Sequence, residues 1–174
     1  NLVTLRGGGV FQGWLYVITE AVEARTFDDW LVGQRESGAP VPAGVALHLF
    51  DSLCGALQGA HRQGVAHGAL SPSTVLLRAL SPGAYHAWVL DLGLGRWLRD
   101  ASTVAAVNPP PVAYLAPEQD AGGDGTVRSD VFSLALLLVE LLCGTAAPGC
   151  GPRETFARGV PRLHKTLPAV LKGL

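Results

Sequence analysis

The sequence of 174 residues carries little charge and no cluster of basic residues. Charged side chains make up 16% of the chain, and the formal net charge is -1. A protein that binds nucleic acid usually presents grouped lysine and arginine side chains, because the phosphate backbone is a polyanion. The sequence therefore predicts no nucleic-acid partner.

Cysteine is also scarce, and its spacing does not suit a metal or disulfide framework. The three cysteines are an odd number without C-x-x-C spacing: Cys54, Cys143 and Cys150. Such a pattern predicts neither a disulfide framework nor a zinc site. Cys54 and Cys143 lie in apolar runs, where a free cysteine behaves as a small hydrophobe. Reduced thiols, together with the lack of a cationic leader at residues 1–5, predict a cytoplasmic location.

Long hydrophobic runs are missing as well. The longest run, residues 134–142, contains Glu140 and falls far below the ~18 residues that suggest a membrane span. We therefore expect no membrane segment in this chain. The motifs G-x-S-x-G, Walker A and H-E-x-x-H are also absent, so hydrolase, P-loop and zincin functions have no support.

What is present is a composition with 48% hydrophobic residues, typical of one globular domain with a sizeable core. The N-terminal part predicts two strands, residues 2–5 and 15–19, joined by a turn at Gly7, Gly8, Gly9 and Gly13. The spacing of these glycines is similar to that of a phosphate-covering G-x-G-x-x-G loop. However, the third glycine is one position late and the following strand has no lysine, so a hairpin turn is favoured.

Helices and short strands alternate along the rest of the chain. The predicted elements are a short helix over residues 27–33, a helix over 49–61, strands over 74–77 and 87–90, a buried helix capped by Ser129 that ends near residue 142, and an amphipathic segment over 153–174. Pro42 suits the start and Gly64 the end of the helix over 49–61.

Five segments, in order, carry a family resemblance. They are residues 16–22 (YVITEAV), residues 67–77 (HGALSPSTVLL), Asp91-Leu92-Gly93, Ala116-Pro117-Glu118 and residues 129–134 (SDVFSL). Together they resemble the eukaryotic-type Ser/Thr protein kinases, whose catalytic loop reads H-R-D-L-K-P-x-N and whose later motifs read D-F-G and A-P-E. The bacterial branch is the most similar in character, chiefly through residues 60–77 (AHRQGVAHGALSPSTVLL).

This resemblance implies an α+β fold, a protein-kinase-like domain with a mainly helical large lobe and the last strands of the small lobe. Residues 1–19 would be small-lobe strands, 20–26 the hinge and 27–174 the large lobe, in one domain truncated at both ends. The family's glycine-rich loop and strand lysine would precede the first residue. The arginine that pairs with Glu118 in active relatives would follow the last residue.

The resemblance also shows which catalytic groups are missing. The loop keeps its frame with His67 in place, but the family's catalytic Asp falls on Ala69, its Lys on Ser71 and its metal-binding Asn on Thr74. Ala69 has no group that accepts a proton, and losing a positioned base typically costs about 10²–10⁴-fold in rate. Ser71 brings no charge, and Thr74 is a poorer metal ligand than an amide oxygen. We therefore expect no intact catalytic residue and no ordinary phosphotransfer.

Other positions imply a nucleotide site. By resemblance, Thr19 is the gatekeeper, and the backbone at Glu20 and Val22 would meet adenine. Leu76 would lie beneath the ring, and Asp91 would hold Mg²⁺ between the phosphates. The cofactors that the resemblance implies are thus ATP and Mg²⁺.

Two further expectations concern shape and regulation. In the family, the position of Asp130 accepts hydrogen bonds from the catalytic-loop backbone, which here means the peptide groups of His67 and Gly68. Ser102 and Thr103 lie where active relatives carry regulatory phosphosites. Because the arginine that would pair with such a phosphate is replaced by Gly68, the usual electrostatic switch lacks its cation.

The function that this pattern favours is that of a pseudokinase, a binding, regulatory or scaffolding module for a protein partner, with ATP binding an open question. Two alternatives remain. One is an active Ser/Thr protein kinase in which another acid or base reaches the site. The other is a truncated or decaying copy with no independent fold. The identity of the partner and the oligomeric state are also open.

Overall fold

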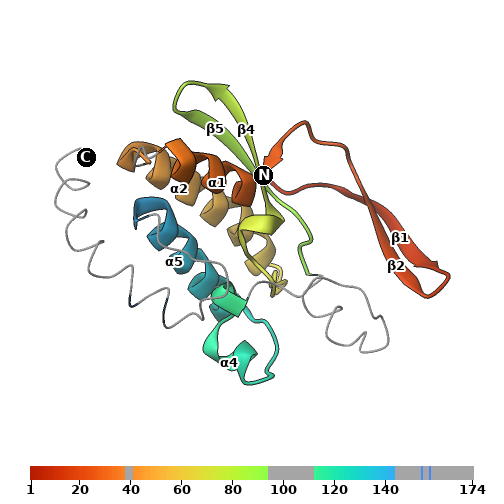
Figure 1. Ribbon diagram of the computed structural model, residues 1–174. Coiled ribbons are helices and arrows are strands. Elements are labelled where there is room, and N and C mark those ends of the chain that lie inside the picture. The colour runs from red at the N-terminus through yellow and green to blue at the C-terminus, as the bar shows by residue number, and fades with distance from the viewer. Residues whose placement is uncertain (38–40, 94–111, 144–153, 155–156, 158–174) are drawn as a thin grey trace.

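Two small sheets and a group of helices make up the computed structural model, which describes residues 1–37, 41–93, 112–143, 154 and 157 (Figure 1). The first sheet is an antiparallel hairpin of β1 (Leu5–Phe11) and β2 (Trp14–Thr19). The second is antiparallel in the order β3 (Arg25–Thr26), β4 (Val75–Ser81) and β5 (Ala84–Val89). In Figure 1 the β1–β2 hairpin extends away from the helices.

The helices follow the apolar pattern of the sequence. They are α1 (Phe27–Ser37), α2 (Ala43–His61), α4 (Pro117–Asp120) and α5 (Val127–Cys143), with 3₁₀ turns η1 (Pro72–Thr74) and η2 (Val112–Tyr114). Pro42 precedes α2, and Gly64 follows it with φ +74°, a conformation that glycine adopts without strain. Both boundaries confirm the prediction. No helix in the described ranges is long and apolar enough to cross a membrane.

The core lies where α2 packs against β5 and α5. Its buried side chains come from α1, α2 and α5 and from the second sheet: Phe27, Trp30, Leu49, Leu53, Leu57, Val75, Val89, Leu136, Leu137 and Leu141. Trp30 contacts Phe27 and meets the ring of Tyr85 edge-on at 5.4 Å between centroids. This core holds the ends of α2, β4 and α5 together, and these are the elements that position the catalytic loop.

Three sequence predictions need correction. The first strand is Leu5–Phe11 rather than residues 2–5, and the hairpin turns at Gln12 and Gly13, both with positive φ. Gly9 lies inside β1 opposite Tyr16, where a Cβ on Gly9 would come within 2.8 Å of the Tyr16 hydroxyl. The first helix continues to Ser37, beyond the predicted residue 33.

The third correction concerns the start of α5. The helix begins at Val127, and the residue before it, Thr126, is the cap. The Thr126 Oγ1 atom accepts the Ser129 N–H, and the Ser129 Oγ accepts the Thr126 N–H at 3.1 Å. Ser129 is thus the inner member of a reciprocal cap rather than the cap itself. The hairpin of β4 and β5, by contrast, confirms the predicted strand pair and extends it.

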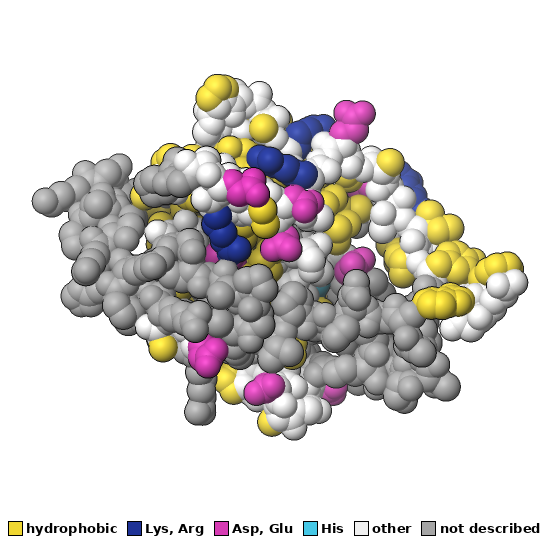
Figure 2. All heavy atoms as spheres, viewed as in Figure 1, with side chains coloured by type: hydrophobic (Ala, Val, Ile, Leu, Met, Phe, Trp, Pro, Cys, Tyr) yellow, Lys and Arg dark blue, Asp and Glu magenta, His cyan; other side chains and the backbone are white. Residues whose placement is uncertain are grey.

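The β1–β2 hairpin exposes most of its large apolar side chains. Leu5, Val10, Phe11, Trp14, Tyr16 and Ile18 are between 45% and 67% exposed. Figure 2 shows hydrophobic side chains gathered over this hairpin. A two-stranded hairpin alone is marginally stable in water. An apolar surface of this kind usually marks a place that another segment or protein covers.

Candidate functional site

The predicted catalytic loop connects α2 to β4 and is almost entirely buried. Residues 67–72 are buried, and Ser73 is the exposed residue of the loop. Gly68 has φ +74°, and the carbonyl oxygen of this residue accepts a hydrogen bond from Gln119 Nε2 at 2.7 Å. Gly125, in the segment before α5, packs so closely that a Cβ there would lie 2.4 Å from the Gly68 Cα. The loop is therefore held from outside by the segments around α4 and α5.

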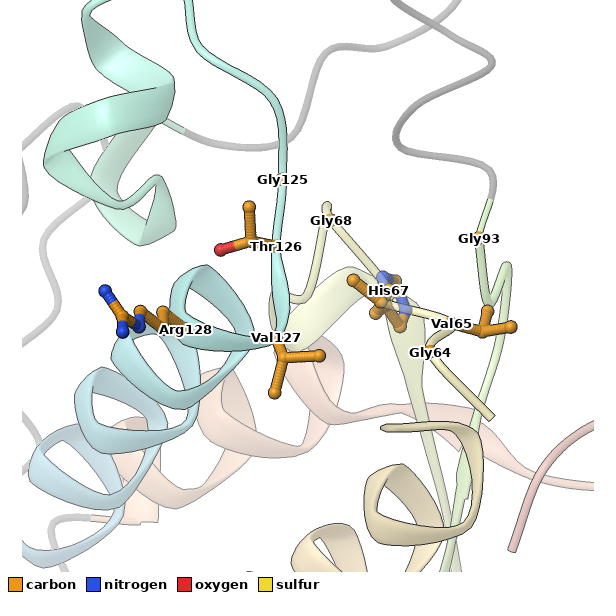
Figure 3. Close-up of a pocket in the computed structure, with 10 residues that line it drawn as sticks. Gly64, Val65, His67, Gly68, Gly93, Gly125, Thr126, Val127 and Arg128 are labelled. Carbon is orange, nitrogen blue, oxygen red and sulfur yellow. The ribbon is translucent and has the colours of Figure 1, made fainter. Parts of the chain in front are cut away.

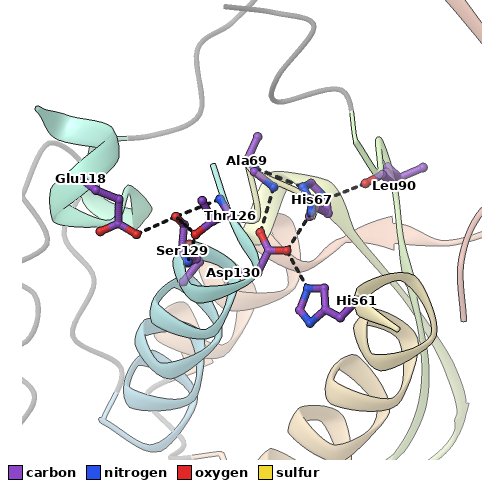
Figure 4. Close-up of polar contacts among 10 residues, drawn as sticks. His61, His67, Ala69, Leu90, Glu118, Thr126, Ser129 and Asp130 are labelled. Carbon is purple, nitrogen blue, oxygen red and sulfur yellow. Dashed lines mark hydrogen bonds and ion pairs between the residues drawn. The ribbon is translucent and has the colours of Figure 1, made fainter. Parts of the chain in front are cut away.

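Asp130 of α5 fixes the peptide groups at the start of this loop (Figure 4). Its Oδ2 accepts the His67 N–H at 2.7 Å, and its Oδ1 accepts the Gly68 N–H at 2.8 Å. His61 of α2 lies 2.8 Å from Oδ2. The carboxylate is 1% exposed, so these charge-assisted bonds replace the water that an ionised group requires. The structural role predicted for Asp130 is confirmed.

His67 ties the loop to the segment that carries Asp91. Its Nε2 lies 2.8 Å from the Leu90 carbonyl oxygen, and its Nδ1 accepts the Ala69 N–H at 3.2 Å. This pair of contacts requires the neutral imidazole with the proton on Nε2. Burial lowers the pKa of His67, and the nearby Asp130 carboxylate opposes this in part. His67 thus supports the loop as a neutral side chain.

The three substituted loop positions carry no carboxylate, amine or amide side chain. Ala69 is buried and has no side-chain acceptor. The Ser71 side chain is fully buried, with its Oγ 2.9 Å from Ser73 Oγ. The Thr74 hydroxyl accepts the Ser71 N–H and donates to the Ser71 carbonyl oxygen, both at 3.0 Å. The hydroxyl groups of Ser71 and Thr74 therefore serve the loop itself.

Asp91 differs from these residues because its carboxylate is exposed. It follows β5 with φ +59°, directly after Leu90, whose N–H donates to the Thr74 carbonyl oxygen at 2.8 Å. Its side chain forms no hydrogen bond or ion pair with the described residues. Asp91 is thus the one residue of the predicted phosphate region whose charged group is free to meet a ligand within the part of the chain that is described.

The residues predicted to contact adenine come from the end of β2, the segment that follows it, and β4. Thr19 ends β2, and Glu20 continues the pairing because its N–H donates to the Thr4 carbonyl oxygen at 3.0 Å. The Glu20 carboxylate accepts the Thr4 N–H at 2.8 Å, a bond that lowers its pKa. Val22 is half-buried, and the chain then enters β3, where Thr26 pairs with Leu76. The hinge segment is thereby joined to the strand that carries Leu76.

A cavity of about 730 Å³ lies beside the start of the loop (Figure 3). Its lining comes from three segments, namely residues 64–68, Gly93 and residues 125–128. In Figure 3 the Arg128 side chain points away from His67. None of Thr19, Glu20, Val22, Leu76 and Asp91 lines it. The cavity and the predicted nucleotide site are thus different places.

A buried polar cluster on α5 was not recognised from the sequence. Glu140 is 1% exposed and binds the Arg35 guanidinium of α1 and the Tyr114 hydroxyl of η2. Burial raises the pKa of Glu140, and burial together with this carboxylate raises the pKa of Tyr114. The signal in the sequence is a single acidic residue inside the apolar run 134–142.

Glu118 of the A-P-E motif also has a partner within the described residues. Its Oε1 accepts the Ser129 hydroxyl proton at 2.7 Å, and this bond lowers the pKa of Glu118. The predicted phosphosites Ser102 and Thr103 lie outside the described residues, as does most of the amphipathic segment over 153–174.

Comparison with known proteins identifies the class that this fold and loop define. The protein kinase domain family matches residues 1–156, and the chain belongs to this family. Its protein-kinase-like fold, a mixture of helices and strands, is confirmed by solved structures. The kinase domain of PknI from Mycobacterium tuberculosis has a TM-score of 0.64 and 27% identity, over 86% of this chain and 52% of that chain.

The similar curated proteins are bacterial serine/threonine-protein kinases. Probable serine/threonine-protein kinase PknB of Lactococcus lactis is 30% identical over 145 residues, 83% of this chain and 22% of the relative. Serine/threonine-protein kinase PknJ of Mycobacterium tuberculosis is 29% identical over 171 residues, 98% of this chain and 28% of the relative. The chain thus spans less than a third of the length of these relatives, and the resemblance to bacterial Ser/Thr kinases is confirmed at the level of the family.

Proposed function

We propose that this chain is a pseudokinase domain, a kinase-fold module that binds a protein partner and does not transfer phosphoryl groups. The observation that carries the proposal is the catalytic loop. Its backbone is held by Asp130 and His67, while the side chains at positions 69, 71 and 74 provide no base, no cation and no free metal ligand. The shape of a kinase loop is kept without its reacting groups.

The physical argument rests on what phosphotransfer requires. The incoming hydroxyl needs a proton acceptor, the γ-phosphate needs a cation, and metal ions neutralise the developing charge. Ala69 removes the acceptor, and the buried Ser71 replaces the cation with a hydroxyl that faces Ser73. These losses occur in one loop and act on the same transition state, so the loss of rate belongs to the loop as a unit and is not a sum of separate effects.

Nucleotide binding is part of the proposal. The path from Thr19 through Glu20 and Val22 to Leu76 suits an adenine site between the hinge segment and β4, and Asp91 lies at the end where phosphates would extend. Asp91 is the one side chain of this region whose carboxylate has no hydrogen bond or ion pair among the described residues, so it is the residue that would hold Mg²⁺ there. A cation there would be held mainly by the phosphate oxygens of the nucleotide.

Phosphotransfer with radiolabelled ATP and a generic protein substrate tests the proposal. We expect no incorporation above the background of an Asp91→Ala variant, with the kinase domain of a bacterial relative as positive control. Incorporation that the Asp91→Ala change abolishes would establish the alternative, an active Ser/Thr kinase with unorthodox catalytic residues. A cooperative thermal transition measured on the same sample excludes a decaying copy with no independent fold.

The domain limits and the partner surface belong to the same proposal. We take residues 1–19, 20–26 and 27–174 as small-lobe strands, hinge and large lobe of one kinase-like domain in a longer cytoplasmic protein. The exposed apolar side chains of β1 and β2 support this, because further small-lobe strands would cover them. Limited proteolysis of the whole protein tests it: the hairpin should resist cleavage there and be cut in the isolated chain.

A further inference from the structure

The β4–β5 hairpin carries an arginine stacked on a tryptophan on the face that points away from the core. The register pairs Arg78 with His86 and Leu76 with Trp88, so these four side chains lie on one face of the sheet, here called the outer face. The opposite face belongs to the core through Val75, Leu77, Ala87 and Val89. In Figure 1 the turn of this hairpin projects beyond α1 and α2.

The Arg78 side chain is exposed, and the half-buried Trp88 ring supports it. The guanidinium carbon lies 5.1 Å from the ring centroid, a cation–π contact. The His86 ring packs against the same indole, with 4.2 Å between the two ring centroids. The guanidinium forms no hydrogen bond or ion pair with the described residues, so its N–H donors are available to a ligand. A side chain already held by stacking loses little conformational freedom when it binds.

The surroundings of this stack are positive rather than negative. Burial lowers the pKa of His86, and neighbouring positive groups, Arg78 and His48 among them, lower it further. No carboxylate of the described residues acts on His86 in the opposite direction. The outer face therefore offers an imidazole beside a permanent cation, and it supplies no negative group of its own to pair with Arg78.

We propose that the outer face of the β4–β5 hairpin binds a protein partner: an acidic side chain of the partner pairs with Arg78, and an adjacent apolar side chain packs on Trp88. This proposal rests on the binding role under the proposed function and names the surface and the chemistry of the partner. Arginine and tryptophan are among the residues that dominate binding energy at protein interfaces. Leu80, which is 61% exposed, adds apolar area near the turn of the same hairpin.

A phosphate group is the other anion that an arginine commonly binds. A phosphate monoester carries up to two charges and three acceptor oxygens, so it is matched by several cationic donors. Of the four side chains on the outer face, only Arg78 carries a permanent charge. One guanidinium presents two parallel N–H donors that match the two oxygens of a single carboxylate. The outer face thus favours an acidic side chain.

Selection from a random-peptide phage library against the purified protein tests the proposal. We expect the selected peptides to be enriched in Asp or Glu next to an apolar residue, and the same selection against Arg78→Glu should lose this enrichment. Arg62→Glu is the control, because Arg62 is also exposed but stacks on no ring among the described residues. It should select the same peptides as wild type. A cooperative melting curve for each variant shows that it is folded.

A synthetic peptide with the enriched sequence then gives the size of the effect, measured by fluorescence anisotropy. Arg78→Met keeps the alkyl part of the side chain and removes the charge-assisted hydrogen bonds, so it should weaken binding about 10–100-fold. Replacing the acidic residue of the peptide by its amide should weaken binding to wild type similarly. The same replacement should add little to Arg78→Met, because both changes remove one interaction.

The proposal is wrong if wild type selects no acidic consensus, or if Arg78→Glu selects the same peptides as wild type. Equal losses in Arg78→Glu and Arg62→Glu would also overturn it, since they would indicate attraction by overall charge. Binding of inorganic phosphate that Arg78→Met abolishes, without an acidic consensus, would assign Arg78 to a phosphate-bearing ligand instead. Phosphotransfer in the radiolabel assay would overturn the pseudokinase assignment and leave these results standing, because the selections measure binding alone.

Discussion

The catalytic loop and the β1–β2 hairpin differ in how much of their structure depends on the rest of the chain. The loop is buried and forms hydrogen bonds with Gln119 of α4 and Asp130 of α5, and His61 of α2 in turn contacts the Asp130 carboxylate. The hairpin contacts mainly itself and exposes its large apolar side chains. The lost catalytic groups thus lie in one of the most constrained parts of the molecule.

The loop has kept the hydrogen bonds that support its backbone. Here the support is complete, including a buried carboxylate with three partners. The hairpin, by contrast, has an apolar surface that needs a cover. The described residues supply the hydrogen-bond partners of the loop backbone, whereas they leave the apolar surface of the hairpin exposed.

The largest expected effect comes from removing the support of the loop. Asp130→Ala leaves the buried N–H groups of His67 and Gly68 without an acceptor, which should lower the free energy of unfolding by about 3–5 kcal/mol. Chemical denaturation followed by circular dichroism measures it. Asp120→Ala, an exposed carboxylate in α4, is the control and should change stability little. Equal losses in both variants would contradict the role of Asp130.

A second variant tests the close packing beneath the loop. In Gly125→Ala the new Cβ would lie 2.4 Å from the Gly68 Cα, so backbone must move. We expect a loss of about 1–3 kcal/mol or more, since overpacking against backbone cannot relax by a rotamer change. Gly59→Ala, on the exposed side of α2 with no neighbour within 4 Å, should instead stabilise by up to about 1 kcal/mol. Similar melting temperatures for both variants would refute the contact.

The state of His67 gives the loop a pH dependence. Burial lowers the pKa of His67 in the folded protein. Below pH 6.5 the His67 side chain is therefore protonated in the unfolded chain but still neutral in the folded protein. The stability from this residue is present above pH 6.5 and is lost as pH falls towards its folded pKa. Glu140, whose pKa is raised, contributes with the opposite sign. The measurement compares the free energy of unfolding of wild type and His67→Asn as a function of pH. Below pH 6.5 the free energy of unfolding should fall less steeply in His67→Asn than in wild type. Parallel curves for the two proteins would contradict the prediction.

Substitutions in the β1–β2 hairpin should change the free energy of unfolding least. Trp14 is 59% exposed, so Trp14→Ala is expected to change the free energy of unfolding by no more than about 0.5 kcal/mol. Trp30→Ala, at a tryptophan 1% exposed in the core, should cost about 3–5 kcal/mol. Denaturant titration of both variants checks the contrast. A large loss from Trp14→Ala would mean that the hairpin is already covered in the isolated chain.

Much of the fold could be predicted from motifs and periodicity. The spacing of apolar residues over 49–61, with Pro42 and Gly64 at its ends, predicted α2, and the role of Asp130 followed from the family resemblance. The strand limits around Gly7–Gly9 were wrong because glycine suits both a turn and a strand covered by a ring such as that of Tyr16. The Ser129 cap was displaced because Thr126 is an equally good capping residue three positions earlier.

The properties of the candidate site also fall into those that the sequence predicts and those that only the tertiary structure shows. Residue identity alone shows that positions 69, 71 and 74 lack a base, a cation and an amide, since side-chain chemistry does not depend on the fold. It does not show where the remaining hydroxyls point. The tertiary structure decided that the Ser71 and Thr74 hydroxyls serve the loop, that His67 is neutral, and that Glu140 is shared by Arg35 and Tyr114. The hydroxyl contacts of Ser71 and Thr74 are local, but they depend on the conformation of the buried loop. The contacts of Glu140, and that of His67 with Leu90, join residues far apart in the chain, which local sequence does not encode.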